Sequence, residues 1–379
     1  MSSFSPDDWL AQRTLAFDSS GIRKVFDLAA QLNNPVNLSI GQPDFDVPSP
    51  VKAAGIAAIE QGRNGYTVSQ GIAPLRDALR DQITSQYDHP DRDVFITSGT
   101  SGGLTLAILS LVNPGDEVIV FDPYFVMYVP LVQLAGGHPV LIDTYPDFRI
   151  DVDRVREAIS PRTKLILFNS PGNPTGVTPS REEVRAIAEL ADARNIALLS
   201  DEIYSRFVYD EDWTSPAEFN PRTIVIDGFS KSHAMTGWRI GWAHGPASII
   251  QSMIKLQQYT FVCAPQPAQW AGLAALQTPV ETYRQQYQRK RDLLIEGLRG
   301  TFQFTRPGGA FYLFPQAPPG FSGSEFVRLA IENNLLIIPG NIFSQRDTHF
   351  RISYAAPDET ICRGIEILNR LATERRTQS

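Results

Sequence analysis

Apolar runs of strand length recur between residues 94 and 227, with helical stretches between several of them. The runs cover residues 94–97, 117–121, 139–142, 165–168, 196–199 and 223–227. Continuous apolar runs are typical of strands that are buried on both faces, and alternation with helices is typical of parallel strands. The pattern therefore predicts an α/β fold, in which helices cover both faces of a mostly parallel sheet.

A different pattern follows residue 245. Helical spacing covers residues 247–259, 266–276 and 280–298, and we expect the last helix to bridge into a second domain. The remainder mixes further helices with short strands, including runs at 302–305 and 310–314. We expect a large domain at residues 45–280 and a smaller α+β domain at residues 1–44 and 281–379, which suits a chain of 379 residues.

Charge and composition exclude several classes of protein. The net charge is −7 and the basic residues are scattered, which argues against binding to nucleic acid or to a membrane surface. No apolar run approaches the ~20 residues that span a bilayer. The two cysteines are far apart and predict neither a disulfide framework nor a metal site. The polar N-terminus lacks the apolar core of a secretory signal, so we expect a cytoplasmic protein.

Residues whose side chains could react or bind a ligand follow the predicted strands. Thr100, Phe125, Asn173, Asp201 and Lys231 each lie in a loop just after one of these strands. Open α/β sheets bind ligands beyond the carboxyl ends of their strands, so we expect these loops to meet in one site.

The loop at residues 98–103, rich in Ser, Thr and Gly, precedes a helix that we expect to begin at residue 104. Backbone N–H groups at a helix start favour anions. The spacing matches neither the P-loop nor the dinucleotide fingerprint.

Lys231 is surrounded in the sequence by small and apolar residues. Desolvation would favour its neutral amine, which can form a Schiff base with a carbonyl. Arg239 nearby suits a phosphate, so the pair suggests a phosphorylated aldehyde cofactor such as pyridoxal phosphate. Asp201 ends an apolar strand, where it could pair with a pyridinium nitrogen, cap a helix or form an ordinary salt bridge. Two exposed ion-pairing side chains are the alternative for Lys231 and Arg239.

The stretch 228–241 has small residues before Lys231 and Met-Thr-Gly-Trp-Arg-Ile-Gly after it. It resembles the lysine signature of the class I/II pyridoxal-phosphate aminotransferases, the aspartate aminotransferase superfamily of fold type I. The resemblance extends from about Asn37 to Tyr354. It implies the fold type I architecture, with a large cofactor-binding domain and a smaller domain.

The resemblance also implies roles for individual residues. Lys231 would hold the cofactor covalently and act as the catalytic base. The cofactor ring would contact Phe125, Asn173, Asp201 and Tyr204. The cofactor phosphate would contact Thr100, Ser101 and Arg239. Arg351 would bind the substrate α-carboxylate, with Gly41 and Asn173 also at the substrate. Tyr66 would reach the phosphate of a neighbouring subunit, which implies a homodimer.

The implied reaction moves an amino group from an L-amino acid to a 2-oxo acid by a ping-pong mechanism. A C–S (β) lyase or a ring-forming synthase could use the same scaffold. A ligand-sensing regulator is a further alternative, although the roughly 35 residues before Asn37 leave little room for a DNA-binding module. A lysine-dependent aldolase without a cofactor is another. The amino donor stays open. In some dicarboxylate-specific members of the resembled family an arginine of the partner subunit reads an acidic side chain, and the candidates for it here are Arg13, Arg23 and Arg284.

Overall fold

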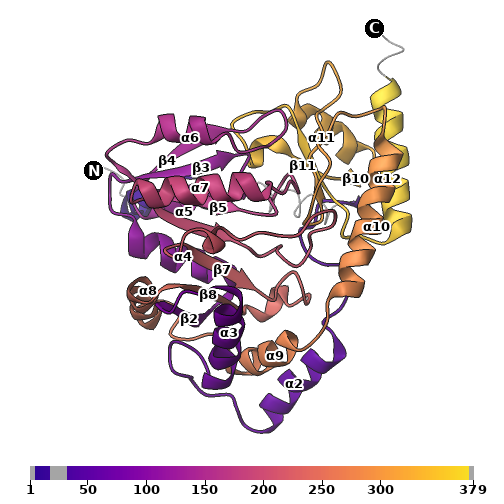
Figure 1. The fold of residues 1–379 in the computed structure, drawn as a ribbon. Coiled ribbons are helices and arrows are strands. Elements are labelled where there is room, and N and C mark those ends of the chain that lie inside the picture. The colour runs from indigo at the N-terminus through magenta and orange to yellow at the C-terminus, as the bar shows by residue number, and fades with distance from the viewer. Residues whose placement is uncertain (1–4, 18–31, 375–379) are drawn as a thin grey trace.

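The computed structural model describes residues 5–17 and 32–374. Its centre is a seven-stranded sheet in the order β2-β8-β7-β6-β5-β3-β4 (Figure 1). The strands are β2 (Arg92–Thr97), β3 (Glu117–Asp122), β4 (His138–Asp143), β5 (Thr163–Asn169), β6 (Ala197–Asp201), β7 (Ile224–Gly228) and β8 (Gly241–Pro246). In this sheet β8 pairs antiparallel with β2 and β7, and the remaining pairs are parallel. The predicted mostly parallel sheet is confirmed.

Helices cover both faces of the sheet, as the apolar runs predicted. Val118 and Val120 belong to a core on one face with residues of α4, α5 and α8, whereas Ile119 belongs to a core on the other face with α6 and α7. The alternation follows from the two-residue period of a strand. The helices are α4 (Gly99–Leu111), α5 (Tyr128–Leu134), α6 (Val152–Ala158), α7 (Arg181–Ala193) and α8 (Ala247–Tyr259).

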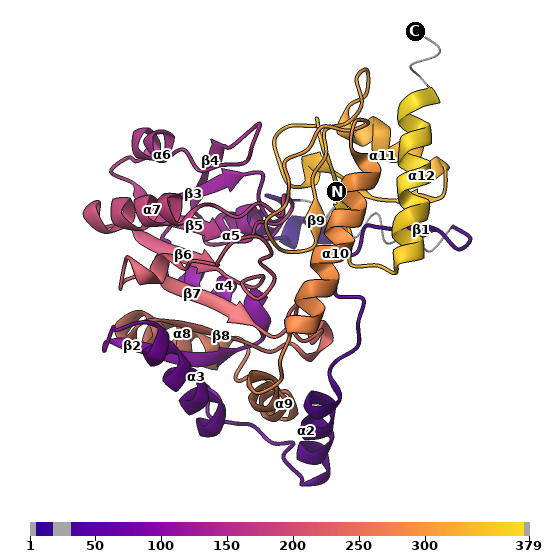
Figure 2. The ribbon, with the colours of Figure 1, turned by 45° about the vertical axis from the view of Figure 1, so that its right-hand side comes forward.

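The β2 side of the sheet is covered by three more helices. Leu75 and Leu79 of α3 and Ala268 and Ala271 of α9 share a core with Val94 of β2. Helix α2 packs against α9 at the end of the molecule opposite α12 (Figures 1 and 2). The three helices are α2 (Ser49–Glu60), α3 (Ala73–Gln86) and α9 (Gln266–Leu276).

Short strands and three helices form a second group of elements. In this group β1 (Val36–Asn37) pairs with β10 (Leu335–Leu336), and β12 (Phe350–Ser353) lies between β11 (Ile338–Pro339) and β9 (Tyr312–Leu313). Helix α10 (Glu281–Leu298) runs beside α12 (Asp358–Glu374), and α11 (Gly323–Glu332) packs next to them (Figure 2).

The core of this second group joins distant parts of the chain. It contains Val36 and Leu38 near the N-terminus together with residues of α10, α11 and α12. It also contains Tyr204 and Phe207, which follow β6 of the large sheet. The segment after β6 therefore connects the two groups of elements directly.

Two expectations about local structure were wrong. Helix α4 begins at Gly99 and not at residue 104, so the Ser/Thr/Gly loop forms its first turns. Gly99 has a φ of +69°, which glycine adopts easily. Residues 302–305 form no strand, although Phe302 and Phe304 pack into the core by their side chains. Apolar side chains can be buried without their backbone pairing in a sheet. A sequence pattern shows the burial but does not tell a paired segment from an unpaired one.

Within the described residues, no helix combines the length and the apolar character needed to cross a membrane. In the same ranges, no group of three or more His, Cys, Asp or Glu side chains is arranged to hold a metal ion. Cys263 and Cys362 are both free thiols.

Gly241 pairs with Gly228 where β8 meets β7, and we expect even a methyl group there to be harmful. A Cβ atom on Gly241 would lie 2.8 Å from the Asp227 carbonyl oxygen and 3.1 Å from the backbone nitrogen of Thr100. Backbone atoms cannot rotate away, so Gly241→Ala should cost about 1–3 kcal/mol of unfolding free energy. The urea midpoint of unfolding, followed by circular dichroism, should fall accordingly.

Gly65→Ala is the matched control, because a Cβ atom on Gly65 meets nothing within 4 Å. Equal urea midpoints for the wild-type protein and the Gly241→Ala and Gly65→Ala variants would contradict the predicted clash.

Candidate active site

A cavity of about 320 Å³ lies beyond the carboxyl ends of the parallel strands. Its walls come from loops after β2, β3, β5, β6 and β7, and from the second group of elements. Predicted site residues in the lining are Gly41, Thr100, Ser101, Phe125, Asn173, Asp201, Tyr204, Lys231, Arg239 and Arg351. The structure thus brings together residues that are up to 310 positions apart in the chain, from Gly41 to Arg351.

Lys231 follows β7 and presents its amine to the cavity. Its Nζ donates a hydrogen bond to the carbonyl oxygen of Gly41 at 2.6 Å. Burial, reinforced by the positive charges of Arg351 and Arg239, lowers the pKa of Lys231 from 10.5 to about 8, although Asp201 acts in the opposite direction. About a tenth of the amine is therefore neutral at pH 7, far more than for an ordinary lysine.

Asp201 ends β6 with a carboxylate that is almost fully buried. One oxygen accepts a hydrogen bond from the hydroxyl of Tyr128 at 2.8 Å, and the other accepts one from the backbone N–H of Ile203 at 3.3 Å. Burial raises the pKa of Asp201 to about 6, against the lowering effect of these hydrogen bonds and of Lys231. A buried carboxylate of this kind favours a positively charged ligand atom beside it.

Arg351 lies on β12 and is 1% exposed. Nη1 donates to the Asn173 side-chain oxygen at 3.0 Å and Nη2 donates to the Ser39 carbonyl oxygen at 2.8 Å. Nε is buried and has no hydrogen-bond partner among the described residues. A buried donor without an acceptor is costly, so this guanidinium is suited to a ligand that supplies an anionic oxygen.

The Tyr312 ring packs against the guanidinium group of Arg351. Its ring centroid lies 4.6 Å from the guanidinium carbon, and its hydroxyl shares a 2.8 Å hydrogen bond with the hydroxyl of Tyr204. A Cβ atom on Gly41 would lie 2.7 Å from the Tyr312 hydroxyl oxygen. Glycine at position 41 therefore lets the backbone approach the cavity closely.

Thr100, Ser101 and Arg239 form the anion-binding side of the cavity. Thr100 and Ser101 occupy the first turn of α4, where backbone N–H groups point outward from the helix. Arg239 has a left-handed backbone with φ +54°, and Nη1 donates to the Thr236 carbonyl oxygen at 2.9 Å. A Cβ atom on Gly99 would lie 2.6 Å from Arg239 Nη2, so glycine makes room for the guanidinium.

Some predicted residues lie outside the cavity lining, and some residues at the site were not predicted. Tyr66 does not line this cavity and is 87% exposed, so its proposed reach to a neighbouring subunit stays a prediction. Arg13 and Arg284 are also outside the lining, and Arg23 lies outside the described residues. Tyr128 was not anticipated, although it stands only three residues after Phe125. Tyr312, the last residue of a Gly-Gly-Ala-Phe-Tyr block, was not anticipated at the site either.

The chain matches the family model of class I and II aminotransferases over residues 33–368. It belongs to this family. It is 38% identical to the aspartate/prephenate aminotransferase of Thermus thermophilus, over 92% of this chain and 94% of that protein. It is 34% identical to aromatic-amino-acid aminotransferase 2 of Thermococcus litoralis, over 97% and 99% of the two chains.

A solved aspartate aminotransferase of Thermotoga maritima superposes with a TM-score of 0.91 at 32% identity, over 95% of this chain and 99% of that chain. The chain is therefore an enzyme of the transaminase type with the fold type I architecture. The predicted family, fold class and reaction class are confirmed. Members of the family generally use pyridoxal phosphate.

The residues of this aminotransferase fit such a cofactor. The cavity contains an amine that titrates near 8, a buried carboxylate and a helix start beside an arginine. These groups suit an aldehyde, a protonated ring nitrogen and a phosphate, respectively.

The lowered pKa of Lys231 predicts how fast its amine reacts in the protein without cofactor. Only the neutral amine attacks acetic anhydride, so trace labelling of Lys231 should rise with pH through a midpoint near pH 8 and level off above about pH 9. Mass spectrometry of the Lys231 peptide after labelling between pH 6 and pH 10 measures this. N-acetyl-lysine methyl amide is the control, since an ordinary lysine titrates at about 10.4. A labelling curve for Lys231 that follows the control would contradict the lowered pKa.

Proposed function

We propose that this enzyme uses pyridoxal phosphate to move the amino group of an L-amino acid to a 2-oxo acid by a ping-pong mechanism. The observation that carries the proposal is the meeting of Lys231, Asp201 and Arg351 in one cavity. A lysine that titrates near 8 can act as a base at neutral pH, and a buried arginine with an unpartnered Nε can take a carboxylate.

Three groups of residues would hold the cofactor. Thr100, Ser101 and Arg239 would bind its phosphate, since helix-start N–H groups and a guanidinium both favour anions. Asp201 would face the ring nitrogen and favour its protonated form. The other ring contacts that we propose are Phe125 against the ring face, with Asn173 and Tyr204 on the phenolic oxygen. When bound, the cofactor supplies an aldehyde for the amine and a ring that takes up the charge left when the α-proton departs.

The protein's own groups orient the substrate and move the proton. Arg351 would bind the α-carboxylate, and Gly41 and Asn173 would lie against the substrate beside it. This contact fixes the orientation of the Cα–H bond relative to Lys231. The neutral amine of Lys231 then takes the proton from Cα, and the resulting ammonium later donates it. The second half of the cycle, with a 2-oxo acid, reverses these proton transfers.

The side chain of the preferred amino donor is not set by the fold. The relatives are named for aspartate and prephenate in one case and for aromatic amino acids in another. Arg13 and Arg284 do not line the cavity of their own chain, so a role for either would require it to reach the site of a neighbouring chain. Initial rates with aspartate, alanine, phenylalanine and methionine as donors, each with 2-oxoglutarate and with pyruvate, would identify the substrates.

We further propose a cytoplasmic homodimer in which Tyr66 reaches the phosphate of the neighbouring site. The exposure of Tyr66 and Val68, at 87% and 57%, supports an apolar contact with another chain at this segment. We also propose the domain division at residues 45–280 and at residues 1–44 with 281–379. The two groups of strands support that division, although Tyr204 and Phe207 pack into the core of the smaller part.

Replacing Lys231 tests the proposed function directly. Lys231→Ala removes the base and the covalent attachment point, so kcat should fall by about 10²–10⁴-fold. Borohydride reduction followed by peptide mass spectrometry should place the cofactor on Lys231 in the unchanged protein and nowhere in the variant. Lys164→Ala, at an exposed lysine of β5, is the control and should keep full activity. Full turnover by Lys231→Ala would refute the assignment.

The products distinguish aminotransfer from elimination on the same scaffold. We expect no turnover of a β-substituted amino acid unless a 2-oxo acid is present. Release of ammonia and pyruvate without an acceptor would instead identify a β-lyase.

A further inference from the structure

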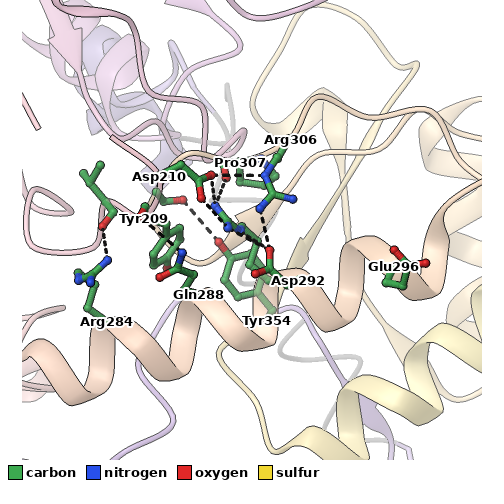
Figure 3. Close-up of polar contacts among 12 residues, drawn as sticks. Tyr209, Asp210, Arg284, Gln288, Asp292, Glu296, Arg306, Pro307 and Tyr354 are labelled. Atoms are coloured by element: carbon green, nitrogen blue, oxygen red, sulfur yellow. Dashed lines mark hydrogen bonds and ion pairs between the residues drawn. The ribbon is translucent and has the colours of Figure 1, made fainter. Parts of the chain in front are cut away.

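Arg291 is a fully buried arginine outside the cavity, on the inner face of α10. Nη1 and Nη2 donate to the two carboxylate oxygens of Asp210 at 2.5 and 3.0 Å. Nη1 also donates to the Pro307 carbonyl oxygen at 3.0 Å, and Nε donates to Asp292 at 3.0 Å (Figure 3). A buried guanidinium needs such partners, because an uncompensated charge in the interior is strongly destabilising.

The two segments that Arg291 joins form a short ladder. Val208 and Gly309 pair as an antiparallel bridge. The Tyr209 N–H donates to the Gly308 carbonyl oxygen at 2.9 Å, and the Ala310 N–H donates to the Phe207 carbonyl oxygen at 2.8 Å. Asp210 and Pro307 stand at one end of this ladder, and Arg291 contacts both.

The other end of the ladder reaches the active-site cavity. Tyr204 precedes one segment and Tyr312 follows the other, and their hydroxyls are 2.8 Å apart. The Tyr312 ring lies under the guanidinium of Arg351 at 4.6 Å. The ladder therefore connects Arg291 mechanically to the surface that supports Arg351.

Two more tyrosine hydroxyls bind the ladder between its two ends. The Tyr354 hydroxyl donates to the Ala310 carbonyl oxygen at 3.2 Å, and the Tyr209 hydroxyl donates to the same oxygen (Figure 3). Tyr354 follows β12, which carries Arg351. The pairing of β9 with β12 joins the same parts by backbone, with Tyr312 opposite Ser353 and Leu313 opposite Ile352. The ladder and the strand of Arg351 are thus held together by side chains and by backbone.

We propose that Arg291 and Asp210 are positioning residues for substrate binding: their bidentate ion pair fixes the ladder so that Tyr312 holds Arg351 ready for the α-carboxylate. The inference rests on the proposed function, because it takes Arg351 as the group that binds the carboxylate. Loosening the ion pair would displace the ladder with Tyr312 and weaken carboxylate binding. Lys231, which follows β7, and Asp201, which is held in β6 of the large sheet, would keep their positions.

Asp210→Asn tests this, because it keeps the side-chain shape and removes the negative charge. Two inhibitors serve as probes. One is the deamino analogue of the best amino donor, which keeps the carboxylate, and the other is the primary amide of that analogue. Displacement of a carboxylate-binding group by a fraction of an ångström should raise the inhibition constant of the acid by about tenfold. The inhibition constant of the amide should change by less than about twofold, since the amide carries no carboxylate for Arg351 to bind.

Asp358→Asn is the matched control. Asp358 also pairs bidentately with an arginine of α10, Arg289, at 2.7 and 3.0 Å. Its side chain is 44% exposed and that of Asp210 is 40% exposed. Asp358 has no contact with the ladder, so the variant should leave both inhibition constants unchanged.

Several outcomes would overturn the inference. An unchanged constant for the acid in Asp210→Asn, or equal losses for the acid and the amide, would leave only a structural role for the ion pair. If Asp210→Asn yields no folded protein, Asp210→Glu replaces it, since it keeps the charge and moves it by one methylene; the same selective loss for the acid is expected, and its absence refutes the inference. If the unchanged enzyme binds the acid no better than the amide, the assignment of Arg351 fails instead, which separates the two proposals.

Discussion

The cost of burying charge governs this structure. Lys231, Asp201 and Arg351 are ionisable groups withdrawn from water into one cavity. Burial disfavours their charged forms: it raises the pKa of Asp201 and lowers the pKa values of Lys231 and Arg351. Such groups persist in a folded protein when neighbouring dipoles or a ligand compensate them. Backbone carbonyls, a tyrosine hydroxyl and an asparagine supply part of this compensation, and the unpartnered Nε of Arg351 marks where the protein alone does not complete it.

The sheet supplies the rigid frame for these charges. Parallel strands end at one edge, so the loops after β3, β5, β6 and β7 deliver their side chains to the same place. The second group of elements closes the cavity from the other side with Tyr312 and Arg351. Contacts such as the Tyr204–Tyr312 hydrogen bond and the Arg291–Asp210 ion pair then set how the two sides face each other.

Much of this arrangement could be predicted from local patterns in the sequence. Apolar runs located the strands, and the lysine stretch with its family resemblance located Lys231, Asp201, Arg239 and Arg351. Contacts between distant residues left no such pattern. Tyr204 and Tyr312 are 108 positions apart and Arg291 and Asp210 are 81 apart, so neither pair was anticipated. The start of α4 was also misplaced, because glycine and serine are as typical of loops as of first helical turns.

The N-terminal segment contributes to the cavity in two separable ways. Its backbone oxygens at Ser39 and Gly41 accept hydrogen bonds from Arg351 and Lys231, and Ile40 and Gln42 also line the cavity. A carbonyl oxygen is present whatever the side chain. The hydrogen bonds to both basic groups therefore do not depend on which side chains stand at positions 40 and 42, so these contacts place no constraint of their own on the residue type there.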